Sequence, residues 1–140
     1  LTQAKAAGLT IPFVGGDGWD GVEADYADAA EGHYFANHYA KTDPAQNIQD
    51  FVANFTAKYK EAPNALAALA YDAVYAMAAA LEDAGSTDAD DLIAALASLD
   101  YADAVTGAIK FDADGNPIKA VTMIQIVNGE HEVKAKVSVN

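Results

Sequence analysis

Cysteine is absent from the 140-residue sequence, and basic residues are few: 8 Lys and Arg stand against 21 Asp and Glu, giving a formal net charge of −13. Without cysteine the chain has no disulfide, no Cys-based zinc site and no thiol chemistry. A surface this acidic repels nucleic acids and anionic membranes, because both are bound through clusters of basic side chains. The composition therefore leaves small molecules or other proteins as partners.

The first residues also lack a signal sequence, because Leu1 to Lys5 has neither a basic n-region nor an apolar h-region. These residues are typical of the last turns of a helix that Gly8 ends. We therefore expect a piece of a longer protein. Hydrophobic residues make up 52% of the chain, enough for one globular domain. Much of this fraction is Ala, which predicts a thin, helix-rich core.

Apolar spacing predicts alternating strands and helices with a hairpin at the end. Strands are predicted over residues 9–14, 32–39, 108–111 and 118–127. Asn128-Gly129 predicts a tight turn. A closing strand then has one face made of Val133, Ala135, Val137 and Val139. This order predicts an α/β fold with a mixed sheet, flanking helices and a terminal β-hairpin.

Helices are predicted over residues 22–30, from Asp43-Pro44 to before Pro63, over residues 65–84 and from residue 87 onward. Asp43 is the expected N-cap of the second helix, with Pro44 as its first residue. Residues 65–84 are apolar nearly all round, but Asp72 interrupts the apolar run and leaves it shorter than the about 20 residues that a membrane span needs, so we expect a buried helix. The last helix has the loose capping box Thr87…Asp90 and a buried face made of Leu92, Ile93, Leu96 and Leu99.

The loop Gly15-Gly-Asp-Gly-Trp-Asp-Gly21 is the main candidate site. Its glycines have the spacing of a dinucleotide-binding loop, but Asp17 and Asp20 would repel the phosphates, so a nucleotide-dependent enzyme is disfavoured. A carboxylate at the end of a strand can instead bind an ammonium group, and Trp19 can cover the adjoining aliphatic part. The residues alone leave open whether Asp17 binds a ligand or only forms an Asx-turn.

Other patterns provide no site. A calcium loop opening at Asp112 would need Gly at residue 117 and Glu at residue 123, where the chain has Pro117 and Met123, so a hairpin turn is predicted. His33 and His38, five apart on the predicted strand, would face opposite sides of the sheet. We expect ordinary histidines, no metal and no cofactor. No catalytic set can be assembled, so we expect a binding protein and not an enzyme.

A series of segments resembles the branched-chain amino acid-binding proteins of ABC importers, in the family's order. The segments are residues 3–20, Ala29–Gly32, Tyr34-Phe35, His38-Tyr39, Phe51–Phe55 with Tyr59, Ala70–Tyr75, Thr106-Gly107, Phe111-Asp112 with Gly115, and Val127–Gly129. The resemblance implies a type I periplasmic binding fold, in which two α/β lobes joined by three crossovers close over an amino acid and deliver it to an ABC permease. It also implies that this chain is the C-terminal part.

The resemblance divides the chain into three parts, which we expect to fold as one compact unit. Residues 1–33 resemble the end of the second lobe's main segment, residues 34–117 the return into the first lobe, and residues 118–140 the closing strands of the second lobe. The implied location is periplasmic or extracellular, with or without a lipoprotein anchor. The same fold also serves as a sensory or regulatory ligand-binding domain, and an inactive truncated or engineered fragment is a further alternative.

The resemblance also implies a ligand site. In the family an acidic residue in the loop that matches Gly15 to Gly18 binds the ligand's α-ammonium, and Asp17 aligns with it, flanked by Gly16 and Gly18. Trp19 is expected at the mouth of the cleft. Leu66 stands where family members can present an aromatic residue. Because the family's donors to the ligand carboxylate lie outside this chain, we expect weak or no binding by the chain alone. A missing N-terminal segment, or self-association through exposed sheet edges, would then complete it.

Overall fold

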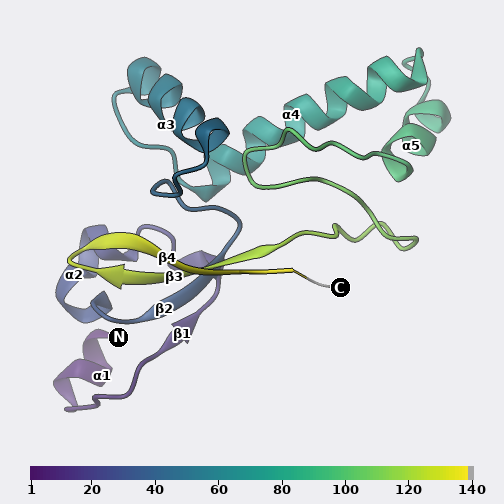
Figure 1. The fold of residues 1–140 in the computed structure, drawn as a ribbon. Helices are drawn as coiled ribbons and strands as arrows, with labels where there is room; N and C mark the ends of the chain where they lie inside the picture. The colour runs from purple at the N-terminus through teal and green to yellow at the C-terminus, as the bar shows by residue number, and fades with distance from the viewer. Residues whose placement is uncertain (139–140) are drawn as a thin grey trace.

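In a computed structural model, which describes residues 1–138, the chain forms two bodies joined by two connections (Figure 1). The sheet body contains α1 (Thr2–Ala6), β1 (Val14–Gly15), the 3₁₀ turn η1 (Asp17–Trp19), α2 (Val22–Ala30), β2 (Tyr34–Asn37), β3 (Val121–Val127) and β4 (Glu130–Val137). The helical body contains α3 (Gln46–Tyr59), α4 (Ala65–Ala84) and α5 (Ala89–Ala97). The chain leaves the sheet after Asn37 and re-enters it at Val121.

The four strands form one mixed sheet in the order β1-β2-β3-β4. β1 runs parallel to β2, whereas β2, β3 and β4 are antiparallel neighbours. The expected hairpin is confirmed: Asn128 and Gly129 have φ angles of 53° and 73°, as a two-residue primed turn requires. The carboxylate of Glu31 holds this turn by accepting hydrogen bonds from both backbone amides, at 2.9 and 3.2 Å. The predicted α/β class with a mixed sheet is therefore correct.

The strands are shorter than predicted, because a strand extends only as far as its partner. The predicted strand over residues 9–14 is reduced to Val14 and Gly15, which pair with Tyr34 and Phe35. Residues 108–111 form no strand; Ile109 and Phe111 make only isolated bridges. β3 begins at Val121, three residues later than predicted.

The closing strand also differs from its predicted face. A register shift between Met123 and Ile124 interrupts the ladder, and of the predicted apolar face Val133 is half-buried whereas Ala135 and Val137 are exposed. Val139 lies outside the described residues.

Two predicted helix starts are wrong. α3 begins at Gln46, because the Asp43 carboxylate accepts a hydrogen bond from the Ala45 amide in a local turn ahead of the helix. α5 is capped by Asp88, whose side chain accepts from the Asp90 amide, so the expected box opening at Thr87 does not form. The start and end of α4 are as predicted, and the reason is local.

The caps of α4 are both encoded nearby. The Asn64 side chain accepts from the Ala67 amide at 2.9 Å, and Gly85 ends the helix with a φ of 58°. Such signals depend only on neighbouring residues, which is why the bounds could be predicted.

The sheet body and the helical body have separate small cores. In the first, Phe35 on β2 packs with Ile124 and Ile126 of β3, which alternate with less buried residues along the strand. In the second, Tyr39, Ile48 and Phe51 pack against Ala65, Ala68 and Val105. Alanine supplies many of the buried positions in both bodies, in agreement with the thin core predicted from composition.

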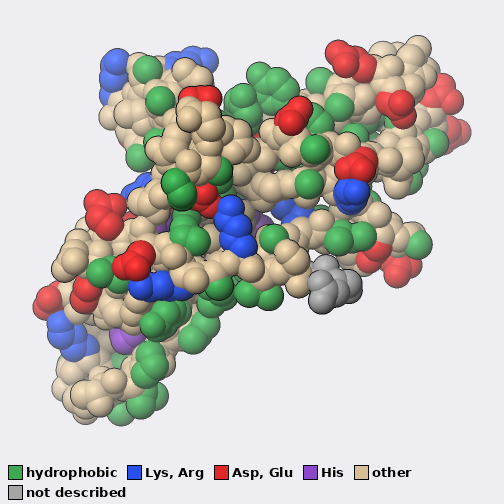
Figure 2. Space-filling view, in the orientation of Figure 1, with side chains coloured by type: hydrophobic (Ala, Val, Ile, Leu, Met, Phe, Trp, Pro, Cys, Tyr) green, Lys and Arg blue, Asp and Glu red, His purple; other side chains and the backbone are tan. Residues whose placement is uncertain are grey.

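The expectation that α4 is a buried helix is wrong for this chain. Its buried face is a narrow strip made of Ala65, Ala68, Asp72, Ala76 and Ala80. The other faces expose large apolar side chains, with Leu66 73% and Val74 68% accessible, and Figure 2 shows hydrophobic side chains on the surface along α4. By length and composition α4 could cross a membrane, a criterion that core helices of soluble proteins also meet. In the last helix Ile93 is likewise exposed.

Candidate functional site

The sheet body and the helical body enclose a hollow of about 200 Å³ where they meet, which we call the junction hollow. The sheet body contributes the η1 loop, the helical body contributes the start of α4, and His38 lies on the connection between them. The lining residues are Asp17, Gly18, Asp20, His38, Asn64, Ala65, Leu66 and Leu69.

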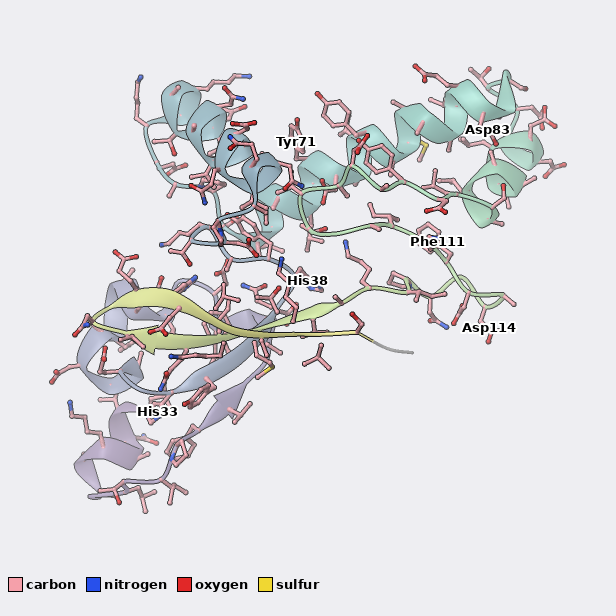
Figure 3. All side chains as sticks on the ribbon, viewed as in Figure 1. His33, His38, Tyr71, Asp83, Phe111 and Asp114 are labelled. Atoms are coloured by element: carbon pink, nitrogen blue, oxygen red, sulfur yellow. The ribbon has the colours of Figure 1, made fainter. Side chains whose placement is uncertain are left out.

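Asp17 is the first residue of η1 and lies two residues beyond the carboxyl end of β1. The short turn places its carboxylate on the solvent side, where 67% of the side chain is accessible. Its Oδ2 lies 3.4 Å from Nε2 of His38, which follows the last residue of β2. Figure 3 shows His38 at the junction of the two bodies. The parallel pairing of β1 and β2 therefore explains why the two side chains meet at one edge of the sheet.

Asp20 connects the two walls of the hollow. Its Oδ2 accepts a hydrogen bond of 2.7 Å from the backbone amide of Ala65, the first residue of α4. Beside this contact the Tyr39 hydroxyl donates to the carbonyl of Pro63, and burial together with the negative charge of Asp20 raises the pKa of Tyr39. The chain from Pro63 into α4 is thus held to the sheet body by polar contacts.

The structure brings together three of the predicted site residues. Asp17 and Gly18 form one wall of the junction hollow and Leu66 forms the opposite wall. Gly16 precedes η1 as its N-cap and does not line the hollow.

The expected place of Trp19 at the cleft mouth needs correction. Its indole packs over Gly15, so closely that a Cβ on that glycine would lie 2.2 Å from the ring. It also joins the core around Phe35 and borders a different depression beside α1 and α2. Its apolar area is used inside the sheet body, because the glycine at position 15 leaves a surface onto which the ring can fold.

Besides Ala65 and Leu69 of α4, three polar residues of the hollow were not predicted as site residues. Asp20 lies in the same glycine-rich loop as Asp17. Its carboxylate could have marked it as a site residue, but it served only as an argument against a nucleotide. Asn64 stands between a proline and a helix, a typical N-cap position. His38 was predicted to be an ordinary strand histidine, but it lies just past the end of β2 and has Asp17 beside it.

A second charged cluster lies away from the hollow, inside the sheet body. The imidazole of His131 on β4 has its Nε2 3.0 Å from Oε1 of Glu23 on α2, and both side chains are more than nine-tenths buried. Nζ of Lys41 stands 3.8 Å from the same oxygen. This cluster links α2, the β3–β4 hairpin and the connection from β2 to α3. Within residues 1–138 no group of three or more His, Cys, Asp or Glu side chains is arranged to hold a metal ion.

The charge of the junction hollow limits what it can hold. Asp17 and Asp20 contribute two carboxylates, and the described residues that line the hollow include neither Lys nor Arg. An ammonium group is therefore favoured there over a carboxylate or phosphate. Leu66 and Leu69 face these acids from α4 and offer an apolar surface to the rest of a small molecule.

The sequence matches the family model described as periplasmic binding protein over residues 1–131. No curated protein sequence matches the chain. Among solved structures, the leucine-binding protein LivK from Thermotoga maritima is 31% identical with a TM-score of 0.86, covering 97% of this chain and 40% of that one. The branched-chain amino acid transporter substrate-binding protein LivJ from Streptococcus pneumoniae, in complex with isoleucine, is 35% identical with a TM-score of 0.80, covering 98% and 39%.

A third similar structure has a different ligand. It is a solute-binding protein of an ABC transporter from R. palustris in complex with benzoate, 29% identical with a TM-score of 0.82, and the match covers 97% of this chain and 38% of that one. The chain therefore spans about two fifths of the length of these relatives. Their agreement in fold over nearly every residue confirms the expected type I periplasmic binding architecture for the part that this chain represents.

Proposed function

Because the chain belongs to the periplasmic binding protein family, we propose that it is part of an extracytoplasmic solute-binding protein that captures a free amino acid for an ABC permease. The chain acts by binding and release and not by catalysis. The ligand lies in the junction hollow, between the sheet body and the helical body.

The observation that carries this proposal is the position of Asp17. Its exposed carboxylate stands at the end of β1 and faces the start of α4 across a hollow of about 200 Å³. In this arrangement Asp17 binds the α-ammonium of the ligand. Leu66 contacts the side chain from the other wall, and Gly18 leaves room for the ligand backbone.

The charges of the hollow favour a zwitterionic amino acid over an aromatic acid. Similar structures hold isoleucine in one case and benzoate in another. Benzoate has no cationic group, so it would face Asp17 and Asp20 with its own negative charge. An amino acid can instead direct its ammonium towards these carboxylates, with a branched-chain side chain against Leu66 and Leu69.

Further polypeptide completes the site in this proposal. The relatives are more than twice as long as this chain, and the described lining of the hollow offers no Lys or Arg side chain for the ligand's carboxylate. The exposed apolar faces of α4 also support a further covering segment, because soluble proteins rarely expose large apolar side chains such as Val74 along a whole helix. We therefore expect the chain alone to bind weakly, and to self-associate unless another segment covers α4.

Calorimetric titration of leucine, isoleucine, valine and benzoate into the folded chain tests the proposal, with sedimentation velocity to report self-association. Replacing Asp17→Asn removes the ammonium's counter-charge and should reduce amino acid affinity at least tenfold, because charged hydrogen bonds are worth about 1.5–3 kcal/mol. The control Asp25→Asn makes the same charge change on an exposed part of α2 and should bind as the parent chain does.

Equal binding by the Asp17→Asn variant would contradict the assigned role of Asp17, and a preference for benzoate would contradict the ligand class. No heat with any ligand from a folded sample would mean that the chain binds only when completed by a further segment, as we expect if the hollow is only half of the site.

A further inference from the structure

The bond between Asp20 and Ala65 crosses from one body to the other. Asp20 follows η1 in the sheet body, and Ala65 is the first residue of α4, 45 residues later in the chain. The two residues lie on opposite walls of the junction hollow. Their hydrogen bond of 2.7 Å is therefore a polar tie between the two walls of the proposed ligand site.

The chemistry of this tie is that of a carboxylate at a helix N-terminus. The first amides of a helix have no partner inside the helix, and the helix dipole makes that end positive. The Asn64 side chain satisfies the Ala67 amide, and Asp20 satisfies the amide of Ala65. α4 has 20 residues, so its N-terminus is a stable place for a negative charge to dock.

We propose that Asp20 is a positioning residue that holds the two walls of the junction hollow at the separation the ligand requires. When the tie breaks, α4 moves away from the η1 loop and Leu66 is no longer opposite Asp17. The ligand then escapes faster, although Asp20 need not touch it. This role rests on the proposed function insofar as the hollow is the ligand site, but the tie itself can be measured without any ligand.

The contacts around Asp20 favour a role in joining the two bodies over a role confined to its own loop. The connection from β2 to α3 leaves the sheet next to this point, and the Tyr39 hydroxyl on it donates to the Pro63 carbonyl, just before α4. Asp20 and Tyr39 therefore hold the same short stretch of chain from two sides. Asp20 supplies the bond directly across the hollow.

Hydrogen exchange and an inter-body distance measure the tie directly. In the parent chain the Ala65 amide should be protected, and Asp20→Ala should speed its exchange at least tenfold. Asp20→Asn retains an acceptor oxygen and should restore most of the protection, because Asn and Asp are equally good at capping. Asp25→Ala, the matched charge control, should leave the rate unchanged.

The natural lack of cysteine allows two unique labels, through Ala24→Cys on α2 and Glu82→Cys on α4, both exposed positions. Resonance energy transfer between the labels should fall in Asp20→Ala and stay at the parent value in Asp25→Ala. Unchanged exchange at Ala65 together with unchanged transfer in Asp20→Ala would overturn the inference.

Leucine binding separates this inference from the proposed function. If the parent chain binds leucine, Asp20→Ala should weaken the affinity about tenfold, mainly through faster dissociation, whereas Asp25→Ala should not. If the parent chain does not bind leucine, ligand binding requires a further segment, and the exchange rate of the Ala65 amide and the label distance alone decide whether the tie exists. Full leucine affinity in an Asp20→Ala variant whose Ala65 amide is exposed would refute the positioning role.

Discussion

Asp72 is the only charged side chain on the buried face of α4, and its removal should unfold the helical body more readily than any other single truncation on that helix. It is 2% exposed. Its carboxylate accepts hydrogen bonds from the amides of Val105 and Thr106, at 2.8 and 2.7 Å, and from the Thr106 hydroxyl at 2.6 Å. Lys119 then donates to the same hydroxyl and to the carbonyl of Gly107. Through these bonds Asp72 attaches to α4 the segment around Thr106, which leads back towards the sheet.

The magnitude follows from the donors that are left behind. Asp72→Ala leaves two amides and a hydroxyl without their acceptor, and each buried unsatisfied donor costs about 1–3 kcal/mol. Allowing for some relaxation and water entry, we expect a loss of about 3–5 kcal/mol, a large part of the 5–15 kcal/mol typical of a domain. Asp72→Asn keeps one acceptor oxygen and should lose less, about 1–2 kcal/mol.

Urea unfolding at pH 7, followed by circular dichroism, measures this loss. The control is Asp83→Ala, an exposed acid that Figure 3 shows near the end of the same helix and that is not among its buried residues. It should change the free energy of unfolding by less than about 0.5 kcal/mol. A loss below about 1 kcal/mol for Asp72→Ala would show that this network does not hold the loop to α4.

Two more predictions concern the sheet body and its contact with the connection to α3. Gly15→Ala should cost about 1–3 kcal/mol in urea unfolding, because the new Cβ would overlap the indole packed on it, whereas Gly16→Ala meets no atom within 4 Å and should cost less than half as much; equal costs would contradict the close approach. Burial favours the neutral form of Asp43, but hydrogen bonds from Lys136 and the Ala45 amide outweigh it and hold the pKa of Asp43 below the usual 3.8. Because that pKa is lowered on folding, the pair stabilises the chain above about pH 4 and loses its effect as the pH falls through the folded value. Lys136→Met should therefore cost about 0.5–1 kcal/mol at pH 7, and the difference from the parent should disappear as the pH falls through the folded pKa of Asp43; a difference that persists after Asp43 is protonated would refute the charge pairing.

Local signals account for what was predicted correctly. Asn64 and Gly85 delimit α4, and Asn128-Gly129 forms the hairpin, because caps and tight turns depend on residues that are neighbours in the chain. Strand lengths depended on pairing between distant segments. Residues 108–111 have suitable side chains for a strand, but no continuous partner lies beside them in the described structure.

The candidate site shows the same contrast between what local sequence predicts and what packing decides. The glycine-rich loop and the resemblance to a known family made Asp17 and Leu66 candidates, and the structure places both on the junction hollow. Trp19 was assigned to the cleft by its neighbours in sequence, but its ring folds back over Gly15 instead. The role of Asp17 in binding stays a prediction until ligand titration tests it.

Local turns, periodicity, composition and the order of short segments were enough to predict the α/β class, the bounds of α4, the hairpin, the acidic character and the family. The side chains that meet across the junction of the two bodies could be identified only from the folded structure. Asp20 and Ala65 are 45 residues apart, and His38 approaches Asp17 only because β1 and β2 pair in parallel. Such contacts depend on how distant segments pack, and no pattern in either segment alone contains that information.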